Sequence, residues 1–435
     1  MKNYRPKVYV AMAVDFLHEG HLNILNKASN LGEVTIGLLT DAAISSYKKF
    51  PNLSYENRKK LIKNLKFVKN IIPQKTLDYE ENLIKLKPDY VVHGDDWKVG
   101  VQKIIRKKVI KVLKKWSGKL IEIKYSNDIS LQDVKKRIFD INNNPINRIN
   151  KLKRLIEVKD LVRILECHNP LSGLIVENTF VKKKNLLLEY DAMWSSSLTD
   201  SVSRAKPDNQ SVDYSTRIQG VSAILSATTK PLLFDIDNGG HIEHLKYIVK
   251  DLERAGVSGI VIEDKIGLKK NSLFDDQTQV KQDSISNFSK KLKVAKLAVV
   301  NKDFLIIARV ESLILGKTVR DAVNRAINYS KAGADCIMIH SKAQEPKKIF
   351  EFSKKFRKTK YFKPLVAVPS TYSKTYERQL KNNGFQIVIY ANHLLRAAYH
   401  NMHKTALSIL KYNRSFESEK FISSIKDVLN LVKSD

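Results

Sequence analysis

Apolar residues along the chain follow two spacings in turn, one typical of buried strands and one typical of amphipathic helices. Residues 7–15 (KVYVAMAVD) and 33–40 (EVTIGLLT) are apolar runs of strand length, and a helical pattern from 21 to 31 lies between them. Alternating strands and helices indicate βαβ units, so residues 1–140 are predicted to form a Rossmann-like domain with a parallel sheet. Its further predicted elements are helix 57–68, strand 70–73, helix 80–87, strand 89–94, helix 101–116 and strand 119–125.

The pattern weakens after this domain. Residues 139–153 (FDINNNPINRINKLK) are rich in asparagine, contain one proline and show little periodicity. Such a composition is typical of a connecting segment. We therefore expect a linker over residues 141–154 and a second domain over residues 155–435.

Eight short apolar runs recur in the second domain, mostly with helical patterns between them. Eight strand–helix units in about 270 residues match the size of a (β/α)8 barrel. The fold class predicted for the whole chain is therefore α/β, a Rossmann-like domain followed by a (β/α)8 barrel. The eight runs are GLIVEN (173–178), AMWSSS (192–197), LLFDID (232–237), GIVIED (259–264), IIARVE (306–311), CIMIHS (336–341), LVAVPS (365–370) and IVIYAN (387–392).

The ends of these runs supply candidate site residues, because active sites of such barrels lie at the carboxyl ends of the strands. A single polar residue at the end of a strand does not indicate a function, because strand ends commonly reach the solvent. Several acidic ends followed by an arginine and a histidine are harder to explain in this way. The candidates are Trp194, Asp235, Asp237, Glu263, Asp264, Arg309, Glu311 and His340.

Asp235, Asp237 and Glu263 offer hard oxygen ligands from two consecutive strands. Mg²⁺ is typically bound through one or two carboxylates, waters and substrate oxygens. Arg309 can bind a carboxylate or a phosphate through two parallel hydrogen bonds. These residues predict a Mg²⁺-dependent enzyme for a small phosphorylated or polycarboxylic acid. The loop EDKIGLKKNSLF (263–274) adds possible phosphoryl-binding groups, namely Lys265, Lys269, Asn271 and Ser272.

A second candidate site lies near the start of the chain. The segment DFLHEGHLNIL (15–25) follows the first predicted strand and opens the first helix, with His18 and His21 on either side of Gly20. The glycine allows the backbone to approach a triphosphate, and a helix N-terminus favours phosphate groups. The histidines can donate to phosphate oxygens and stabilise the charge on a leaving pyrophosphate. Two histidines at this spacing could also be structural or bind a metal.

Composition adds a strong positive charge to this picture. The formal net charge is +32, but the lysines are scattered over helices such as 101–116. We interpret them as solvated surface residues that favour phosphorylated substrates, with no nucleic-acid partner. The two cysteines, Cys167 and Cys336, form no CxxC motif, which fits a cytoplasmic protein. No apolar run approaches the roughly 20 residues of a membrane span and the N-terminus lacks a signal-peptide pattern, so we expect no membrane partner.

Five segments of the second domain resemble the phosphoenolpyruvate mutase family of the isocitrate lyase superfamily. The segments are ECHNPLSGLIVENT (166–179), WSSSLTDS (194–201), DIDNGG (235–240), EDKIGLKKNS (263–272) and ARVESLILG (308–316). The resemblance implies isomerisation of phosphoenolpyruvate to phosphonopyruvate. Phosphonopyruvate hydrolase shares the pocket and is the alternative, although the KKNS sequence favours the mutase.

The same resemblance implies roles for individual residues. Asp235, Asp237 and Glu263 would hold Mg²⁺, directly or through water. Lys269 would lie in a loop that closes over the substrate, and Asp208, in KPDNQS, matches a candidate transient phosphoryl acceptor. The phosphoryl group would be held by Arg309, Asn271, Ser272 and His340, and the rest of the substrate by Trp194, Ser196, Ser197 and Leu198.

The HEGH segment and three others resemble the HxGH cytidylyltransferases, in particular those that act on glycerol 3-phosphate. The others are SYENRKKLIKNLKFV (54–68), VVHGDDW (91–97) and YSNDISLQDVKKRI (125–138). The resemblance implies attack of a phosphate or phosphonate oxygen on the α-phosphorus of CTP, with Mg²⁺. A nucleotide-binding domain without catalysis is the alternative. Besides the two histidines and Gly20, the residues implied for nucleotide and acceptor are Asp15, Lys48, Lys49, Arg58, Trp97 and Ser130.

The order of the two parts resembles that in the bifunctional enzymes of the fosfomycin pathway. This resemblance implies that one chain forms phosphonopyruvate and also transfers CMP from CTP to a small phosphonate. The expected acceptor is 2-hydroxyethylphosphonate, with 2-aminoethylphosphonate as the alternative. Barrels of the superfamily often assemble by exchanging a C-terminal helix, so the amphipathic tail after residue 393 predicts a homo-oligomer, a dimer or a tetramer.

Overall fold

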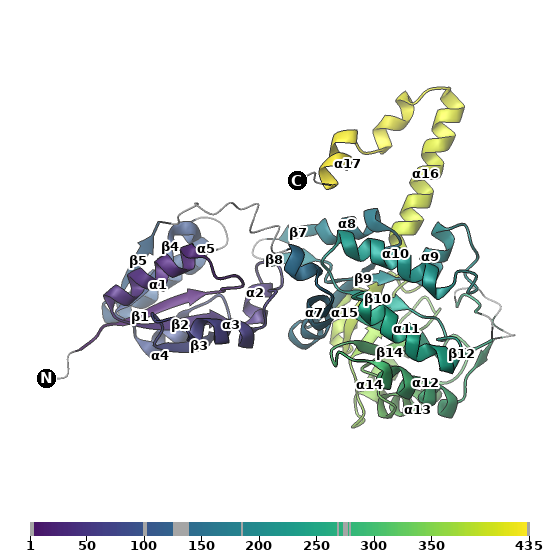
Figure 1. Ribbon diagram of the computed structural model, residues 1–435, viewed down its shortest axis with the longest axis horizontal. Helices are drawn as coiled ribbons and strands as arrows, with labels where there is room; N and C mark the ends of the chain where they lie inside the picture. The colour runs from purple at the N-terminus through teal and green to yellow at the C-terminus, as the bar shows by residue number, and fades with distance from the viewer. Residues whose placement is uncertain are drawn as a thin grey trace. The chain divides into compact units, whose positions relative to one another are not determined.

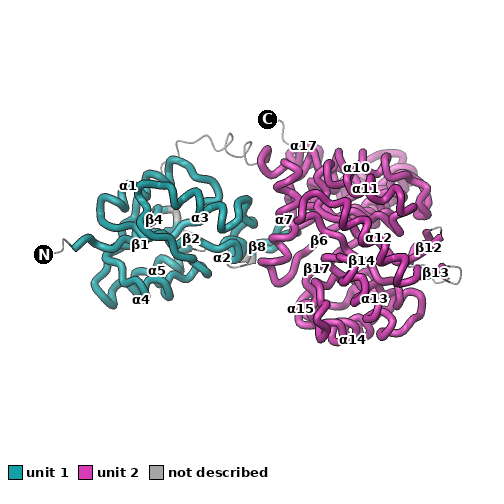
Figure 2. The backbone as a smooth tube through the Cα atoms, turned by 60° about the horizontal axis from the view of Figure 1, so that its bottom comes forward, with its two compact units in different colours: residues 1–138, 180–189 teal, residues 139–179, 190–435 magenta. Residues whose placement is uncertain are grey.

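The computed structural model describes residues 4–98, 102–124, 139–183, 186–267, 269–272, 277 and 280–432. The chain divides into two compact units (Figure 2). Unit 1 comprises residues 1–138 and 180–189, and unit 2 comprises residues 139–179 and 190–435. No helix among the described residues is long and apolar enough to cross a membrane.

Unit 1 is built on a five-stranded sheet in the order β3-β2-β1-β4-β5, in which all described pairings are parallel. The antiparallel hairpin β7–β8 is grouped with this unit. Its elements are β1(Lys7–Met12), α1(Glu19–Leu31), β2(Glu33–Leu39), α2(Asp41–Ser45), α3(Tyr55–Lys63), β3(Asn70–Gln74), α4(Glu80–Leu86), β4(Tyr90–Gly94), η1(Asp95–Lys98), α5(Gln102–Leu113), η2(Lys114–Trp116), β5(Lys119–Ile123), β7(Phe180–Lys183) and β8(Leu186–Glu189).

Side chains of β1 alternate between two cores, because successive residues of a strand point to opposite faces. Val8 and Val10 pack with residues of α1 and α3 on one face. Tyr9 and Ala11 pack with residues of α2, α4 and α5 on the other. The chain reverses direction across the sheet between β1 and β4, and ligands of such sheets bind outside the carboxyl ends of strands at this switch point.

Unit 2 is a closed parallel barrel with the order β10-β11-β14-β15-β16-β17-β6-β9, and helices surround it (Figure 1). The strands are β6(Val162–Glu166), β9(Ala192–Ser195), β10(Leu232–Asp235), β11(Gly259–Glu263), β14(Leu305–Val310), β15(Cys336–Ile339), β16(Leu365–Ala367) and β17(Phe385–Tyr390). The helices are α7(Pro145–Val158), α8(Pro170–Asn178), α9(Ser197–Ser203), α10(Tyr214–Ala227), α11(Ile242–Arg254), α12(Ile285–Ala298), α13(Val319–Lys331), α14(Lys347–Phe356), α15(Glu377–Asn382) and α16(His393–Tyr412). The predicted fold class is confirmed in both units.

One of the eight predicted barrel strands is wrong. Residues 173–178 lie in α8, and the first barrel strand is β6, about ten residues earlier. The helix begins where Asn169 and Ser172 form a reciprocal capping box and Pro170 occupies the first turn. This N-terminal signal outweighs the strand-like apolar run GLIVEN.

The expected linker also differs from the structure, because α7 runs through most of residues 141–154. Asn144 caps this helix, and Pro145 occupies its first turn. Ile149, Leu152 and Leu155 are buried along one face of α7, so the asparagines and lysines between them conceal a helical stripe.

The remaining small elements of unit 2 lie in the loop after β11 and at the C-terminus. A two-residue ladder, β12(Lys265–Ile266) with β13(Lys281–Gln282), pairs the ends of the loop. Helix α16 extends beyond the barrel (Figure 1), and none of its residues is buried. The segments η3(Phe416–Phe421) and α17(Ile425–Leu431) follow it.

Candidate active sites

The turn after β10 places two acidic side chains at the carboxyl end of the barrel. Asp235 ends the strand, and its Oδ1 accepts a hydrogen bond of 3.0 Å from the backbone N–H of Asp237. Asp237 has a φ of 52°, which is strained for a residue with a side chain. Gly239 has a φ of 76°, and a Cβ there would lie 2.7 Å from Ile262 Cδ1. The chain therefore needs the glycine to make this turn.

The ammonium group of Lys269 lies among the acids at this end of the barrel. Its Nζ is 2.7 Å from Asp208 Oδ1 and 2.5 Å from Asp237 Oδ1, and it also donates to Ser197 Oγ. Asn271 Nδ2 donates to the second oxygen of Asp208 at 2.7 Å. Both oxygens of Asp208 are thus bound by the 269–271 segment, which holds this loop over the strand ends.

A second cluster surrounds Arg309 at the end of β14. Arg309 Nε donates to Glu311 Oε1 at 2.5 Å, and its Nη2 donates to Ser272 Oγ at 3.0 Å. His340 Nδ1 lies 2.9 Å from Arg309 Nη2 and 2.9 Å from Glu311 Oε1. Lys265 Nζ donates to Ser272 Oγ at 2.8 Å. The structure therefore brings together Arg309, Ser272 and His340 of the predicted phosphoryl-binding residues, with Glu311 as the carboxylate that orients them. The side chain of the fourth, Asn271, binds Asp208 instead.

Burial and neighbouring cations act in opposite directions on the acids. Burial alone would raise the pKa of Asp235, but Lys269, Arg309 and Arg217 together hold that pKa below its usual value. Glu263 has weaker compensation, and burial raises its pKa to about 7. For Lys269, burial opposes the charge, but Asp237, Asp235 and Asp208 raise its pKa. Nearby positive charge therefore decides whether these buried carboxyl groups are ionised.

The chemistry of the donors fits the predicted Mg²⁺. Among the described residues no three acidic, histidine or cysteine side chains form a ready-made ligand shell. Mg²⁺ does not need one, because it keeps several waters and takes one or two carboxylates. Glu263 Oε2 is buried and accepts no hydrogen bond within the described part of the chain, and its nearest cation is Arg309 Nη2 at 3.3 Å. Asp235, Asp237 and Glu263, each at most 3% exposed, would hold the ion.

The predicted substrate-pocket residues lie next to this cluster. Trp194 lies in β9, one residue before its end, and is 3% exposed. Its Nε1 is buried and has no hydrogen-bond partner among the described residues. Ser196 occupies the N-cap position of α9, and Ser197 and Leu198 lie in the first turn of that helix. Ser197 Oγ donates to Asp235 Oδ2 at 3.0 Å, so this serine joins the pocket segment to the acids.

Asp264 is a strand-end candidate that the structure assigns to the fold. Its Oδ1 accepts from the backbone of Glu311 at 2.9 Å, and its Oδ2 accepts from Tyr329 at 2.7 Å and from Gln282 at 2.7 Å. Arg325 lies 3.3 Å from the same Oδ2. Because its oxygens are bound by protein groups, Asp264 holds β14 and α13 against β11.

In unit 1, the two histidines of the HEGH segment lie together at the start of α1. The rings of His18 and His21 are 3.8 Å apart, and His18 is the N-cap residue. Burial lowers the pKa of both, for His21 to about 3, with further lowering by His18 and Lys48. The imidazoles are therefore neutral near pH 7. Lys48 and Lys49 follow α2 and are exposed, and Lys48 is close enough to His21 to influence its charge.

Arg58 does not have the position expected of a nucleotide ligand. It is fully buried, and its guanidinium donates to the carbonyls of Ala13 at 2.6 Å, Leu39 at 2.8 Å and Leu53 at 3.1 Å. It also pairs with Asp41 at 2.5 Å. Its donors are bound by the protein, so Arg58 fixes the loops at the carboxyl ends of β1 and β2.

Asp15 and Trp97 likewise make contacts within the fold. Asp15 accepts from the backbone N–H groups of Asn52 and Leu53 at 3.0 and 2.9 Å, which fixes the loop before α3. Trp97 is fully buried, stacks on His93 at 3.8 Å and donates to Glu122 at 2.8 Å. Asp15 and Trp97 therefore position neighbouring loops and side chains of unit 1. Ser130 lies outside the described residues.

The contacts of Trp97 include residues that the sequence did not single out. Arg106 binds both oxygens of Glu122 at 2.8 Å, and this pairing above all lowers the pKa of Glu122 to about 2. His93 lies within the segment VVHGDDW (91–97), whose resemblance implies no role for it. The only available signal was its position at the end of a predicted strand.

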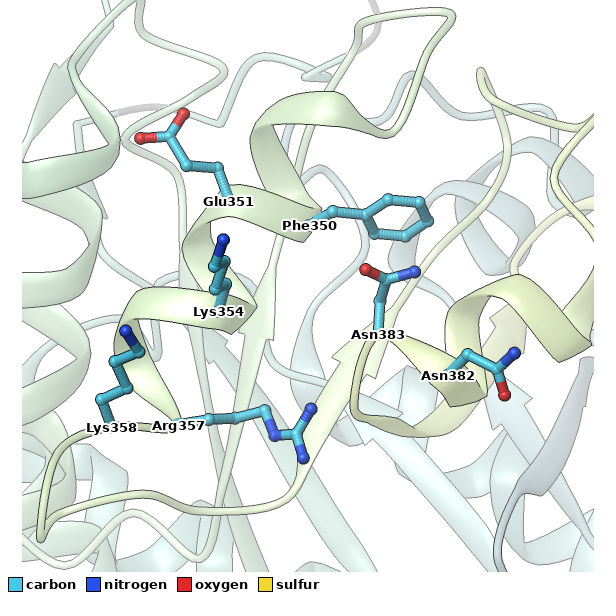
Figure 3. A pocket seen from close by; sticks show the side chains of 7 residues that line it. All are labelled: Phe350, Glu351, Lys354, Arg357, Lys358, Asn382 and Asn383. Carbon is cyan, nitrogen blue, oxygen red and sulfur yellow. The ribbon is translucent and has the colours of Figure 1, made fainter.

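A separate hollow of about 660 Å³ lies in unit 2 between α14 and α15 (Figure 3). Asn382 and Asn383 line it just before β17 begins, so it lies at the amino ends of the barrel strands. The acids of the candidate site lie at the carboxyl ends. This hollow is therefore distinct from the candidate active site.

Comparisons with known proteins agree with this geometry. The family described as phosphoenolpyruvate phosphomutase matches residues 152–410, and the cytidylyltransferase-like family matches residues 14–137. Phosphoenolpyruvate phosphomutase of Tetrahymena pyriformis is 34% identical over 290 residues, which are 66% of this chain and 92% of that protein. Glycerol-3-phosphate cytidylyltransferase of Bacillus spizizenii is 35% identical over 94 residues, 21% of this chain and 73% of that protein.

A solved structure extends the comparison of the barrel. Phosphonopyruvate hydrolase in complex with oxalate and Mg²⁺ is 32% identical, with a TM-score of 0.58, and the match covers 66% of this chain and 94% of that one. Hydrolase and mutase are therefore both relatives of unit 2. Because the phosphomutase family matches more than half of the chain and the Tetrahymena relative is matched over nearly its whole length, this chain belongs to the phosphoenolpyruvate phosphomutase family and carries a cytidylyltransferase-like domain at its N-terminus.

Proposed function

We propose that the chain is a bifunctional enzyme of phosphonate biosynthesis. Unit 2 interconverts phosphoenolpyruvate and phosphonopyruvate, and unit 1 transfers CMP from CTP to a small phosphonate such as 2-hydroxyethylphosphonate. The observation that carries the mutase assignment is the attachment of the 269–272 loop to Asp208 through Lys269 and Asn271. A mutase must keep water away from a reactive phosphoryl group, and a closed loop at the strand ends serves that purpose.

The residues divide the work of the proposed isomerisation. The phosphoryl group leaves the enolate oxygen and is transferred to C3 of the same molecule, so positioning and charge stabilisation dominate. Arg309, Ser272 and His340 bind the phosphoryl oxygens, and Glu311 fixes their orientation. Trp194, in β9, lines the substrate pocket. Mg²⁺, when bound, supplies positive charge for the carboxylate and enolate oxygens.

Asp208 has two possible roles in this scheme, transient phosphoryl acceptor and anchor of the closing loop. Both of its oxygens are bound by loop residues, Oδ1 by Lys269 and Oδ2 by Asn271. A carboxylate in this position is shielded as a nucleophile and well placed as an anchor. We therefore propose the anchoring role.

Hydrolysis of phosphonopyruvate is the alternative reaction of the barrel, since the hydrolase shares its fold at 32% identity. ³¹P NMR of the protein with phosphonopyruvate and Mg²⁺ separates the two. Phosphoenolpyruvate as the product supports the mutase. Inorganic phosphate as the only product would show that unit 2 is a hydrolase.

The transferase assignment rests on the neutral histidine pair at the start of α1, at the switch point of the sheet. Incubation with CTP, Mg²⁺ and candidate phosphonates tests it through pyrophosphate release. Comparison of 2-hydroxyethylphosphonate, 2-aminoethylphosphonate and glycerol 3-phosphate identifies the acceptor. If CTP binds but no pyrophosphate is released from it with any of the acceptors, unit 1 is a non-catalytic nucleotide-binding domain.

We further propose a cytoplasmic homo-oligomer that assembles through α16. Cys167 and Cys336 are free and buried, which fits a reducing compartment. Large apolar side chains of α16, including Tyr399, Met402 and Leu410, are more than two-thirds exposed. A contiguous exposed apolar surface of this kind favours a protein partner, here a second copy of the chain.

A further inference from the structure

Arg217 is a buried arginine that the proposed chemistry leaves unexplained. It lies on the inner face of α10, in the same stripe as Val221 and Ile224, and its exposed fraction is 2%. A charged side chain in a core stripe is unusual, because burying an ion costs free energy unless it is paired. Its guanidinium carbon lies 4.3 Å from the centre of the Phe234 ring.

The guanidinium lies between two carboxylates. Its Nε donates to Asp200 Oδ2 at 3.1 Å, and its Nη1 lies 3.6 Å from Asp237 Oδ2. Neither Nη1 nor Nη2 has a hydrogen-bond partner within the described residues. The positive charge of Arg217 is therefore directed at the carboxylate of a proposed metal ligand.

The two oxygens of Asp237 face different cations. Oδ2 faces Arg217 of α10, whereas Oδ1 is paired with Lys269 of the closing loop. The backbone of Asp237 is strained, with a φ of 52°, and such strain persists only where the surroundings fix the residue. Helix α10 contributes to this fixation twice, because Tyr214 also donates to the carbonyl of Ile236 at 2.7 Å.

We propose that Arg217 is a positioning residue of the metal site. Its positive charge attracts Oδ2 of Asp237, which leaves Oδ1 facing Lys269 and the other acids. The inference rests on the proposed Mg²⁺ site. Partners of metal ligands typically change metal affinity by about 10- to 100-fold when they are removed, because the ligand loses its orientation.

Binding of Mn²⁺, used as a paramagnetic substitute for Mg²⁺, tests this role without any turnover. The free Mn²⁺ signal in electron paramagnetic resonance is measured during titration of the full-length protein without substrate. Arg217→Met is expected to weaken Mn²⁺ binding about 10- to 100-fold. Arg217→Lys keeps the charge but cannot span both carboxylates, so an intermediate affinity is expected.

Arg204 supplies a matched control. It binds the other oxygen of the same Asp200, with Nε 3.0 Å from Oδ1, and its side chain is 34% exposed. Arg204→Met should therefore leave Mn²⁺ affinity unchanged. Thermal unfolding of each variant shows whether the barrel is intact, and Arg217→Lys provides the reading if the methionine variant does not fold.

The outcomes distinguish this inference from the function on which it rests. If the unaltered protein fails to bind Mn²⁺, the proposed metal site is wrong and the role of Arg217 fails with it. If the unaltered protein binds and both Arg217 variants bind equally well or more tightly, the metal site stands and the positioning role is overturned. Tighter binding would mean that Arg217 acts only as a repelling charge.

Discussion

Arg58 and Asp41 form a buried ion pair, and the contacts around it determine whether Arg58 stabilises the fold or binds a ligand. The guanidinium joins the carboxyl ends of β1 and β2 through the carbonyls of Ala13 and Leu39, and it also binds the carbonyl of Leu53 before α3. Removal of one partner of such a pair leaves an uncompensated buried charge, which typically costs about 3–5 kcal/mol. The sequence resemblance implies that Arg58 binds the nucleotide, but its buried contacts indicate that it stabilises the fold.

Arg58→Met is therefore expected to destabilise unit 1 by about 3–5 kcal/mol. Hydrogen exchange of peptides from β1 and β2 measures this loss separately from unit 2, and mutase activity should persist. Lys60→Met, an exposed neighbour on α3, is the control. Normal protection of both strands, together with a raised KM for CTP, would instead identify Arg58 as a nucleotide ligand.

His21 gives unit 1 a predictable sensitivity to acid. Burial, above all, lowers the pKa of His21 to about 3, while its ordinary value is 6.5. Between these values the unfolded chain binds more protons than the folded one, so stability falls as the pH falls from 6.5 towards 3. At pH 5 the loss from this group is about 2 kcal/mol relative to neutral pH.

His21→Gln should remove this part of the pH dependence. The measurement is hydrogen exchange of β1 and α1 peptides at pH 7 and pH 5, corrected for the intrinsic exchange rate. His400→Gln, an exposed histidine on α16 in the other unit, should leave the profile of unit 1 unchanged. An equally steep loss of protection in His21→Gln would mean that another group controls acid stability.

At the scale of elements, Asp208 is the carboxylate that both Lys269 and Asn271 of the 269–272 loop bind, although Lys269 also contacts Asp237 and Ser197. Asp208→Asn keeps the size of the side chain but removes one of the two carboxylate charges paired with Lys269. We expect the mutase rate to fall about 100-fold or more, since a displaced donor of this kind typically has that effect. The share of inorganic phosphate among the products should rise as water enters.

The product ratio from phosphonopyruvate, followed by ³¹P NMR, checks this prediction, and the exposed neighbour variant Asn209→Ala is the control. A slower enzyme with an unchanged product ratio would show that Asp208 takes part in transfer without controlling access of water. Full activity would remove Asp208 from the site.

Helix α8 shows where sequence patterns reach their limit for single elements. The apolar run GLIVEN fits a strand and a helix equally well by composition, and the capping signals of Asn169 and Pro170 decide for the helix. The stripe of α7 is similarly hidden among asparagines and lysines. The strong alternation of the other strands and helices was sufficient to predict both folds.

Asn169→Ala should therefore lower the stability of unit 2 by about 1 kcal/mol, as is typical for the loss of an N-cap side chain. Chemical denaturation followed by a probe in the barrel measures the change. Asn178→Ala, at the last residue of the same helix, is the control and should have a smaller effect. A loss no larger than that of the control would mean that packing alone holds α8.

The candidate sites were predictable to different degrees for a physical reason. Barrel acids such as Asp235 and Glu263 could be found because strand ends converge at one face of the fold. Burial and partners depend on distant segments, so the sequence could not show that Arg58, Trp97 and Asp264 serve the fold. Arg217 left one signal, a charge spaced with the apolar residues that form the buried stripe of α10.

At the scale of the whole molecule, the net charge of +32 acts on both proposed reactions in the same way. Phosphoenolpyruvate, CTP and phosphonates are all anions, and a positive field raises their rate of encounter with either unit. The effect reaches only about 8 Å at physiological ionic strength, so it favours binding near the surface without selecting one substrate. Selection is left to the two sites.

The C-terminal helix α16 makes the strongest prediction at this scale. It has 20 residues, none of them buried, and Tyr399, Met402 and Leu410 are spaced along one stripe with exposures of 70–77%. A helix with such a stripe is stable only when a partner covers it. We expect the protein to self-associate and Met402→Glu with Leu410→Glu to give a monomer of 49.8 kDa in light scattering after gel filtration.

Leu297→Glu with Val300→Glu is the matched control, because these residues are 86% and 83% exposed and lie at the end of α12 and just after it. This variant should keep the mass of the unaltered protein, since isolated exposed apolar residues need no partner. A monomeric unaltered protein at micromolar concentration would show that α16 is stable on its own. Loss of the oligomer in both double variants would mean that added charge, and not the stripe on α16, controls assembly.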